Sequence, residues 1–92
     1  MVSLSSIYVL NPEVVVEGFS ERALALHCTS LRLVELNATA RDLLARLDGQ
    51  ASLARIATAM AHDYQQPEAT LQEDLCDIIA AMAELNVVVL AG

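Results

Sequence analysis

The chain has 92 residues, enough to build one modest hydrophobic core but not two. Hydrophobic residues make up 55% of it and aromatic residues only 3%, so aliphatic side chains and alanine must fill that core. Twelve acidic residues against five Lys and Arg give a net charge of -7. A chain this acidic is repelled by phosphate backbones, and it carries no basic amphipathic stretch to hold an anionic membrane. The composition therefore argues against nucleic acid and membranes as partners.

Residues 1–10 do not resemble a targeting segment. They carry no positive charge and no long apolar run, so a secretory signal is not expected. Nowhere does an apolar stretch approach the roughly 20 residues that cross a bilayer. The two cysteines, Cys28 and Cys76, lie far apart in separate elements. This cysteine usage favours a reduced, cytoplasmic protein over a disulfide-stapled secreted one.

Alternating and β-branched runs in the first third of the chain predict strands. The lead, residues 1–12, is expected to be loose, although residues 7–9 could pair with another strand. Three strands then follow at residues 13–17, 22–27 and 31–36, separated by turns at residues 18–21 and 29–30. Strands joined by turns this short are expected to pair as a three-stranded antiparallel meander.

A helical pattern begins abruptly after Asn37, whose side chain can cap a helix by accepting a backbone N–H. Three helices are predicted: residues 38–47, a helix from the N-cap Ser52 to Tyr64, and residues 67–85. Pro67 suits a first helical position because its missing N–H would be unpaired there. Asn86 tolerates the left-handed conformation that ends many helices. Residues 87–90 form either one more strand or a packed tail.

This order of elements predicts one α+β domain over residues 1–92, a three-stranded antiparallel sheet followed by three helices, similar to a winged helix-turn-helix. The DNA-binding form of that fold needs a recognition helix rich in basic and amide side chains. Residues 67–85 contain no Lys or Arg and several carboxylates. Such a domain is better suited to binding peptides than DNA.

The third predicted helix has more than one apolar face. At about 100° per residue, its core stripe consists of Leu71, Leu75, Ile78, Met82 and Leu85. One flank of this stripe is also apolar and consists of Cys76, Ile79 and Ala83. This flank is either part of a wide buried face or the wall of a groove that a partner segment covers.

The residues that could carry catalysis or bind a metal are few and scattered. His27 and Cys28 are neighbours on a predicted strand, so their side chains point to opposite faces. His62 and Asp63 diverge in a similar way on a helix, whereas a zinc site needs ligands that converge. The glycines are isolated, so no phosphate-binding loop is formed. The sequence predicts no catalytic residue, no metal and no cofactor.

Several segments together resemble the PqqD-like family, the peptide-recognition elements of pathways that make ribosomally synthesised and post-translationally modified peptides. The resemblance covers residues 14–89, and its most specific part is the strand-to-helix segment at residues 32–40. The other similar positions, in chain order, are Leu43-Leu44, Asp48-Gly49, residues 52–57, Tyr64, Asp74-Leu75, Ile78, Ile79, Met82 and Leu85. Asn86 stands where members of the family often have glycine.

The resemblance implies that the leader segment of a precursor peptide adds as a strand to the edge of the sheet. The leader then lies between the third strand and the third helix. Strand addition is physically reasonable, because an edge strand offers unpaired backbone groups. The residues expected to line this groove are Leu31, Arg32, Leu33, Val34 and Glu35 from the strand, with Arg32 as a charge contact, and Cys76, Ile79, Ala80 and Ala83 from the helix.

The chain would then be a non-catalytic protein that presents a precursor peptide to a separate maturation enzyme. This enzyme could be a radical-SAM protein, a leader peptidase of lasso-peptide biosynthesis or another class, and the small size of the chain slightly favours the lasso type. Two other classes of protein stay open. A homodimeric adaptor would cover the flank of Cys76, Ile79 and Ala83 with a second copy. A winged-helix regulator would bind nucleic acid, which the charge disfavours.

Overall fold

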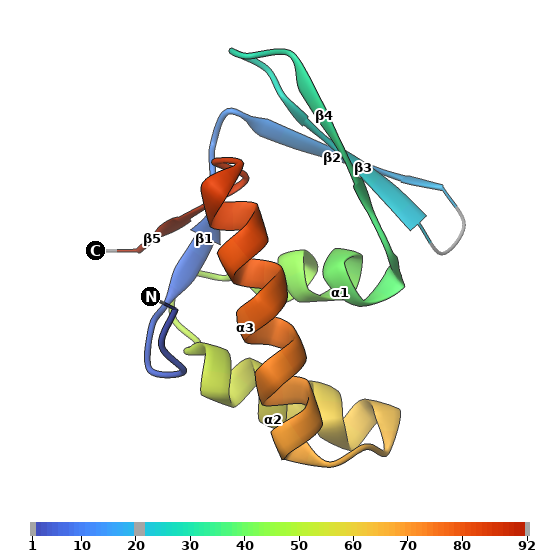
Figure 1. Ribbon diagram of the computed structural model, residues 1–92, viewed down its shortest axis with the longest axis vertical. Helices are drawn as coiled ribbons and strands as arrows, with labels where there is room; N and C mark the ends of the chain where they lie inside the picture. Colours follow the sequence, from blue (N-terminus) through green and yellow to red (C-terminus); the bar gives the residue numbers. More distant parts are fainter. Residues whose placement is uncertain (1, 20–21, 92) are drawn as a thin grey trace.

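The computed structural model describes residues 2–19 and 22–91 and shows the predicted α+β arrangement (Figure 1). A three-stranded antiparallel sheet precedes three helices, which confirms the fold class. The elements in chain order are β1 (Tyr8–Leu10), β2 (Val14–Phe19), β3 (Arg22–His27), β4 (Arg32–Leu36), α1 (Ala38–Arg46), α2 (Leu53–Tyr64), α3 (Glu68–Glu84) and β5 (Val88–Leu90).

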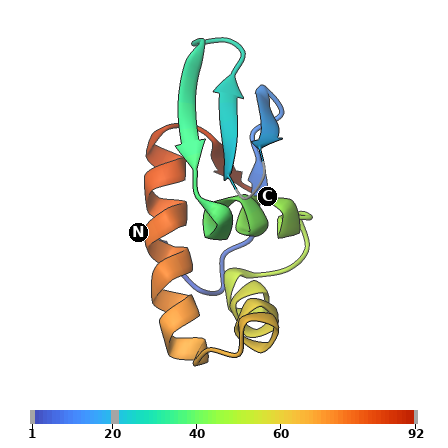
Figure 2. The same ribbon diagram turned by 90° about the vertical axis from the view of Figure 1, so that its right-hand side faces the viewer.

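The main sheet has the strand order β2-β3-β4, so β2 and β4 are its edges. Alternate side chains of a strand point to opposite faces of a sheet. On the inner face Ala23 and Ala25 are 1% and 0% exposed, because α1 lies beneath them (Figures 1 and 2). The described residues leave the outer face uncovered, and Val15 there is 47% exposed.

Three strand boundaries differ from the prediction, the first being the start of β2 at Val14 instead of residue 13. The first strand of the sheet continues through Gly18, which pairs with Ala23 instead of beginning the turn. A Cβ at this position would meet the guanidinium of Arg41, so a larger residue here would require the flexible end of the Arg41 side chain to move. The last strand begins at Arg32, because Leu31 adopts a left-handed φ of 58° and closes the turn after β3. Residues 20 and 21 of the predicted turn lie outside the described residues.

The described part of the N-terminal lead is not loose as expected, and the alternative that residues 7–9 pair with another strand is the one observed. Tyr8 to Leu10 form β1, which pairs with β5 in a second, two-stranded antiparallel sheet. The prediction of a strand within residues 87–90 is thereby confirmed over that of a tail, with the strand beginning at Val88. The backbone N–H of Leu53 donates to the Ser6 carbonyl at 3.1 Å, and the ring of Tyr8 belongs to the core. The lead thus holds the start of α2 through the Ser6 carbonyl and holds β5 through its pairing with β1.

The helix ends follow the predicted caps at three of four positions. The side chain of Asn37 accepts the N–H of Ala40 at 2.8 Å. Ser52 caps α2, and Asn86 has a left-handed φ of 58° after α3. The prediction for Pro67 is wrong by one position, since its ψ of 140° makes it the extended N-cap before Glu68. Among the helices of residues 2–19 and 22–91, none is long and apolar enough to cross a membrane.

Helices α1 and α2 are joined by a polar cluster at their surface. The guanidinium of Arg46 donates to Asp42 at 2.9 Å and to Asp63 at 2.7 Å, and the hydroxyl of Tyr64 donates to Asp42. The hydrogen bond from Arg46 holds the pKa of Asp42 below its usual value. Burial and the neighbouring Asp42 raise the pKa of Tyr64 to about 12.

This cluster makes an acid-sensitive contribution to folding. Because the pKa of Asp42 is depressed in the folded chain, its stabilisation is present above the unfolded value of about 4 and is lost as the pH falls through the folded value. We expect Asp42→Asn to lower the free energy of unfolding at pH 7 and to flatten its decline below about pH 4. Urea unfolding of both proteins at several pH values measures this difference.

Asp77→Asn is the matched control for this experiment. Asp77 is exposed and makes no ion pair within the described part of the chain. Its removal should leave both the stability at pH 7 and the acid decline close to those of the unaltered chain. Parallel acid curves for Asp42→Asn and the unaltered chain would show that the cluster contributes nothing.

Candidate functional site

The free edge of β4 exposes backbone hydrogen-bonding groups. In an antiparallel ladder, the residues of a strand alternate between facing the partner strand and facing away from it. The His27 carbonyl accepts the N–H of Leu31 at 2.7 Å, so the backbone of His27 faces the β4 side, and its ladder partner is Arg32. By this alternation Val34 also faces β3, whereas Leu33 and Glu35 direct their N–H and C=O groups to the free edge.

The side chains of β4 divide between the two faces of the sheet. Leu33 is 62% exposed on the outer face, and Glu35 on the same face forms an ion pair with Arg22 at 2.7 Å. Leu31 precedes the strand and is 75% exposed. On the inner face, Leu36 is 1% exposed and Val34 packs against the core. An apolar edge strand this exposed is unusual for a chain without a partner, because such edges attract additional strands.

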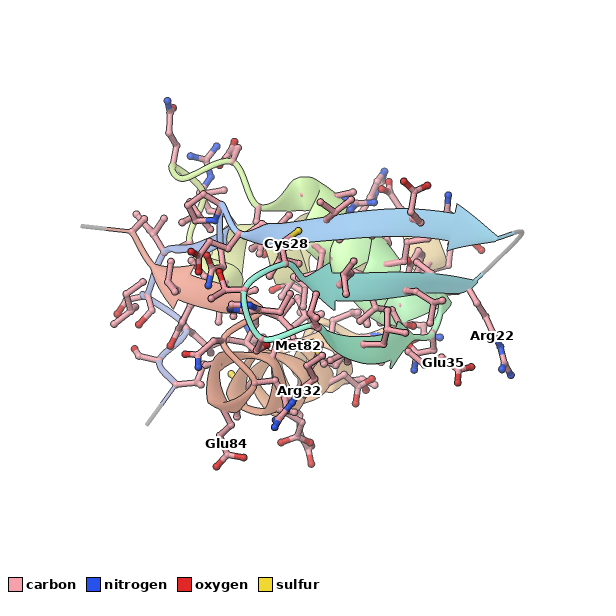
Figure 3. The ribbon with its side chains drawn as sticks, turned by 90° about the horizontal axis from the view of Figure 1, so that it is seen from above. Arg22, Cys28, Arg32, Glu35, Met82 and Glu84 are labelled. Carbon is pink, nitrogen blue, oxygen red and sulfur yellow. The ribbon has the colours of Figure 1, made fainter. Side chains whose placement is uncertain are left out.

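Helix α3 lies beyond the free edge of β4. Viewed from above, β2, β3 and β4 follow one another across the sheet and α3 comes next, with Arg32 directed to the helix side (Figure 3). Figure 2 also places α3 on the β4 side of the molecule. Next to the junction of β4 and α1, a pocket of about 250 Å³ opens between the start of α1 and helix α3. Its lining residues are Asn37, Thr39, Asp74, Asp77 and Ile78.

The predicted α3 flank lies away from this pocket. Ile79, which was expected to line the groove, is 0% exposed in the core. Cys76, Ala80 and Ala83 lie about 140–160° around the helix from Ile78, which lines the pocket. They therefore occupy the side of α3 opposite to the pocket, and Ala83 packs against the core.

The residues that the sequence analysis missed are those that line the pocket. Ile78 was assigned to the core stripe, and neither Asp74 nor Asp77 was expected to line a site. The buried residues of α3 are Leu71, Leu75, Ile79 and Met82. This set is rotated by about 35° from the predicted stripe, which brings Ile78 to the margin of the core. The signal that could have identified these residues is their resemblance to the family segment at Asp74-Leu75 and Ile78.

The groups at this site are suited to contacts with a peptide. Among residues 2–19 and 22–91, no group of three or more His, Cys, Asp and Glu could hold a metal ion. His27 has a structural role, because its Nδ1 accepts the N–H of Ser30 at 3.3 Å and fixes the turn before β4. The site combines an open strand edge, exposed leucines and a carboxylate-lined pocket, a combination suited to an extended peptide.

The fold and this edge define the class of protein: a small α+β domain with an open edge strand beside its last helix. Within that class, the sequence pattern of the family described as coenzyme PQQ synthesis protein D (PqqD) matches residues 7–88. The chain belongs to this family.

A solved structure supports the assignment of the fold. The chain is similar to the protein described as TbiB1 in complex with the TbiA(beta) leader peptide, with a TM-score of 0.77 and 20% sequence identity. The match covers 87% of this chain and 93% of that one. At this identity the likeness establishes the shared fold. The comparison with curated proteins gave no match.

Proposed function

We propose that this chain is a non-catalytic recognition protein for the leader segment of a ribosomally synthesised precursor peptide. The leader adds as a strand to the free edge of β4 and lies between β4 and α3. The observation that carries this proposal is the open backbone edge at Leu33 and Glu35, with α3 beyond it. Membership of the PqqD family and the fold shared with TbiB1, which was solved with a leader peptide, support it.

The backbone of β4 supplies the part of the affinity for the leader that does not depend on the leader's sequence. A peptide strand along this edge exchanges hydrogen bonds with Leu33 and Glu35, the two residues that face away from β3. Each such bond contributes about 1 kcal/mol net. Two residues of β4 therefore set the register of the leader, and the side chains next to them determine which leader is preferred.

Selectivity comes from the pocket beside α3 and from the exposed strand residues. The pocket offers the apolar side chain of Ile78 next to the carboxylates of Asp74 and Asp77. It therefore favours a leader side chain with an apolar stem and a hydrogen-bond donor at its end, and it disfavours an acidic one. Arg32, on the α3 side of the strand, is the charge contact proposed for an acidic leader residue.

The bound leader would be presented to a separate maturation enzyme in the cytoplasm. The site contains backbone groups and side chains suited to binding, so modification of the peptide is assigned to that second protein. The enzyme classes proposed are a radical-SAM protein, a leader peptidase or another class of maturation enzyme. A single domain over residues 1–92 is sufficient for this role, because the strand edge and the helix that bound the site both lie within it.

A titration followed by NMR tests the proposal. The purified chain is titrated with synthetic leader peptides from short precursors encoded beside it, and backbone amide shifts are recorded. We expect the largest shifts at residues 32–36 and 74–78, where the peptide adds to the edge and enters the pocket. Failure of every such peptide to bind a well-folded chain would refute leader recognition. Dimerisation across a dilution series, measured by size-exclusion chromatography, would then favour the homodimeric adaptor.

A further inference from the structure

The outer face of the main sheet carries an apolar row that crosses all three strands. The ladder places Val15 opposite Leu26 and Leu26 opposite Leu33. Leu24 stands beside this row on the same face of β3. Val15 is 47% and Leu33 62% exposed. Neighbouring strands are about 4.8 Å apart, so the row spans roughly 10 Å of continuous aliphatic surface. We call these four residues the outer patch.

The outer patch contributes nothing to the core of this chain. Among the described residues, the core takes in Val16 and Val34 of the inner face but neither Leu24 nor Leu26. Antiparallel sheets with one solvated face normally carry polar residues there. A contiguous aliphatic surface with charged residues beside it is typical of an interface with another protein.

The polar residues beside the outer patch are mainly acidic. Glu17, Leu24 and Glu35 stand opposite one another across the three strands, with a carboxylate on each side of the leucine. Glu35 is paired with Arg22, whereas Glu17 makes no ion pair within the described residues. The face is therefore left with a net negative charge, as is the whole chain at -7. Complementary charge on a partner is positive.

We infer that the outer patch is the docking surface for the maturation enzyme, through an aliphatic or aromatic surface edged by Lys or Arg. This inference rests on the proposed function. Leu33 belongs both to the outer patch and to the strand that receives the leader, so an enzyme seated on the patch has the bound peptide within reach. A second copy of this chain is a poorer occupant, because it would bring Glu17 and Glu35 against acidic residues of the same kind.

Substitution at the edge farthest from the leader tests this inference. Val15 lies on β2, two strands from the free edge of β4. We expect Val15→Lys to weaken binding of the purified maturation enzyme encoded beside this chain at least tenfold, and to change leader affinity less than twofold. Val89→Lys is the matched control, since Val89 is a partly exposed strand valine outside the outer patch. Both affinities are measured by calorimetry on the full chain.

A second variant keeps the test decisive if Val15→Lys folds poorly. Glu17→Lys reverses an exposed charge beside the outer patch and should weaken the enzyme several-fold, more strongly at low ionic strength. Enzyme binding that survives both variants would overturn the inference, as would a concentration-dependent dimer that either variant abolishes. If the unaltered chain binds no leader peptide, the proposed function is refuted instead. The leader titration and the enzyme titration are separate measurements, so the two failures can be told apart.

Discussion

Leu33→Pro is expected to weaken leader binding about a hundredfold while the chain stays folded. The N–H of Leu33 faces away from β3, so proline at this position removes no hydrogen bond from the sheet, and edge strands tolerate proline in this way. The same change leaves a leader carbonyl without its donor and sets a pyrrolidine ring against the incoming strand. A hundredfold loss corresponds to about 2.7 kcal/mol, within the range for an unsatisfied buried carbonyl plus a steric clash. Calorimetric titration with the leader peptide measures it.

Two further substitutions distinguish the contribution of the Leu33 N–H to leader binding from that of the Leu33 side chain. Leu33→Ala keeps the N–H and removes most of the exposed side chain, so it should cost far less leader affinity than proline does. Val34→Pro removes an N–H that faces β3, so it should lower the thermal midpoint instead. Leader binding retained in a folded Leu33→Pro variant would mean that the leader does not add to the β4 edge.

Much of the fold was predictable because its signals are local. The side chain of Asn37 reaches the N–H of Ala40 whatever the rest of the chain does, and Ser52 acts in the same way. The left-handed preference of Asn86 is equally a property of one residue. Such signals place the starts and ends of elements within a residue or two.

The pairing of β1 with β5 was not predictable as a definite outcome. Tyr8 is aligned with Leu90, almost the whole length of the chain away. A three-residue strand gives too short a pattern to name its partner, and its stability comes from the tertiary core that buries Tyr8. Leu31 was missed for a related reason. Its left-handed φ is imposed by closure of the turn after β3 and runs against the preference of leucine.

The strand beside the candidate site could be read from the sequence, but the orientation of α3 could not. Residues 31–36 are mostly apolar with Arg32 and Glu35 interrupting, a pattern that predicts a half-exposed strand. The direction in which α3 faces is fixed by packing against α2 and β5. Ile78 and Ile79 are equally apolar, so periodicity alone leaves open which of them faces the core.

Substitutions of Ile78 and Ile79 should have large and opposite effects on stability and on leader affinity. Ile79 is 0% exposed, and Ile79→Ala should lower the free energy of unfolding by about 3 kcal/mol, the usual cost of a cavity of this size. Ile78 lines the pocket at the margin of the core, so Ile78→Ala should cost only about 1 kcal/mol. Leader affinity should respond in the opposite order, falling about tenfold for Ile78→Ala and changing little for Ile79→Ala. Urea unfolding and calorimetric titration at low temperature give the two quantities.

The cost of Ile79→Ala is a large part of the stability of a small domain, so that variant needs a milder companion. Ile79→Val removes one methylene group, should cost about 1 kcal/mol, and leaves the chain folded for titration. If α3 faces the leader with Ile78, Ile79→Val binds the leader as the unaltered chain does. Weakened binding by Ile79→Val together with normal binding by Ile78→Ala would mean that the leader meets α3 on the flank of Cys76 and Ala83. In that case α3 must rotate when the peptide binds, because the unbound core leaves no room at Ile79.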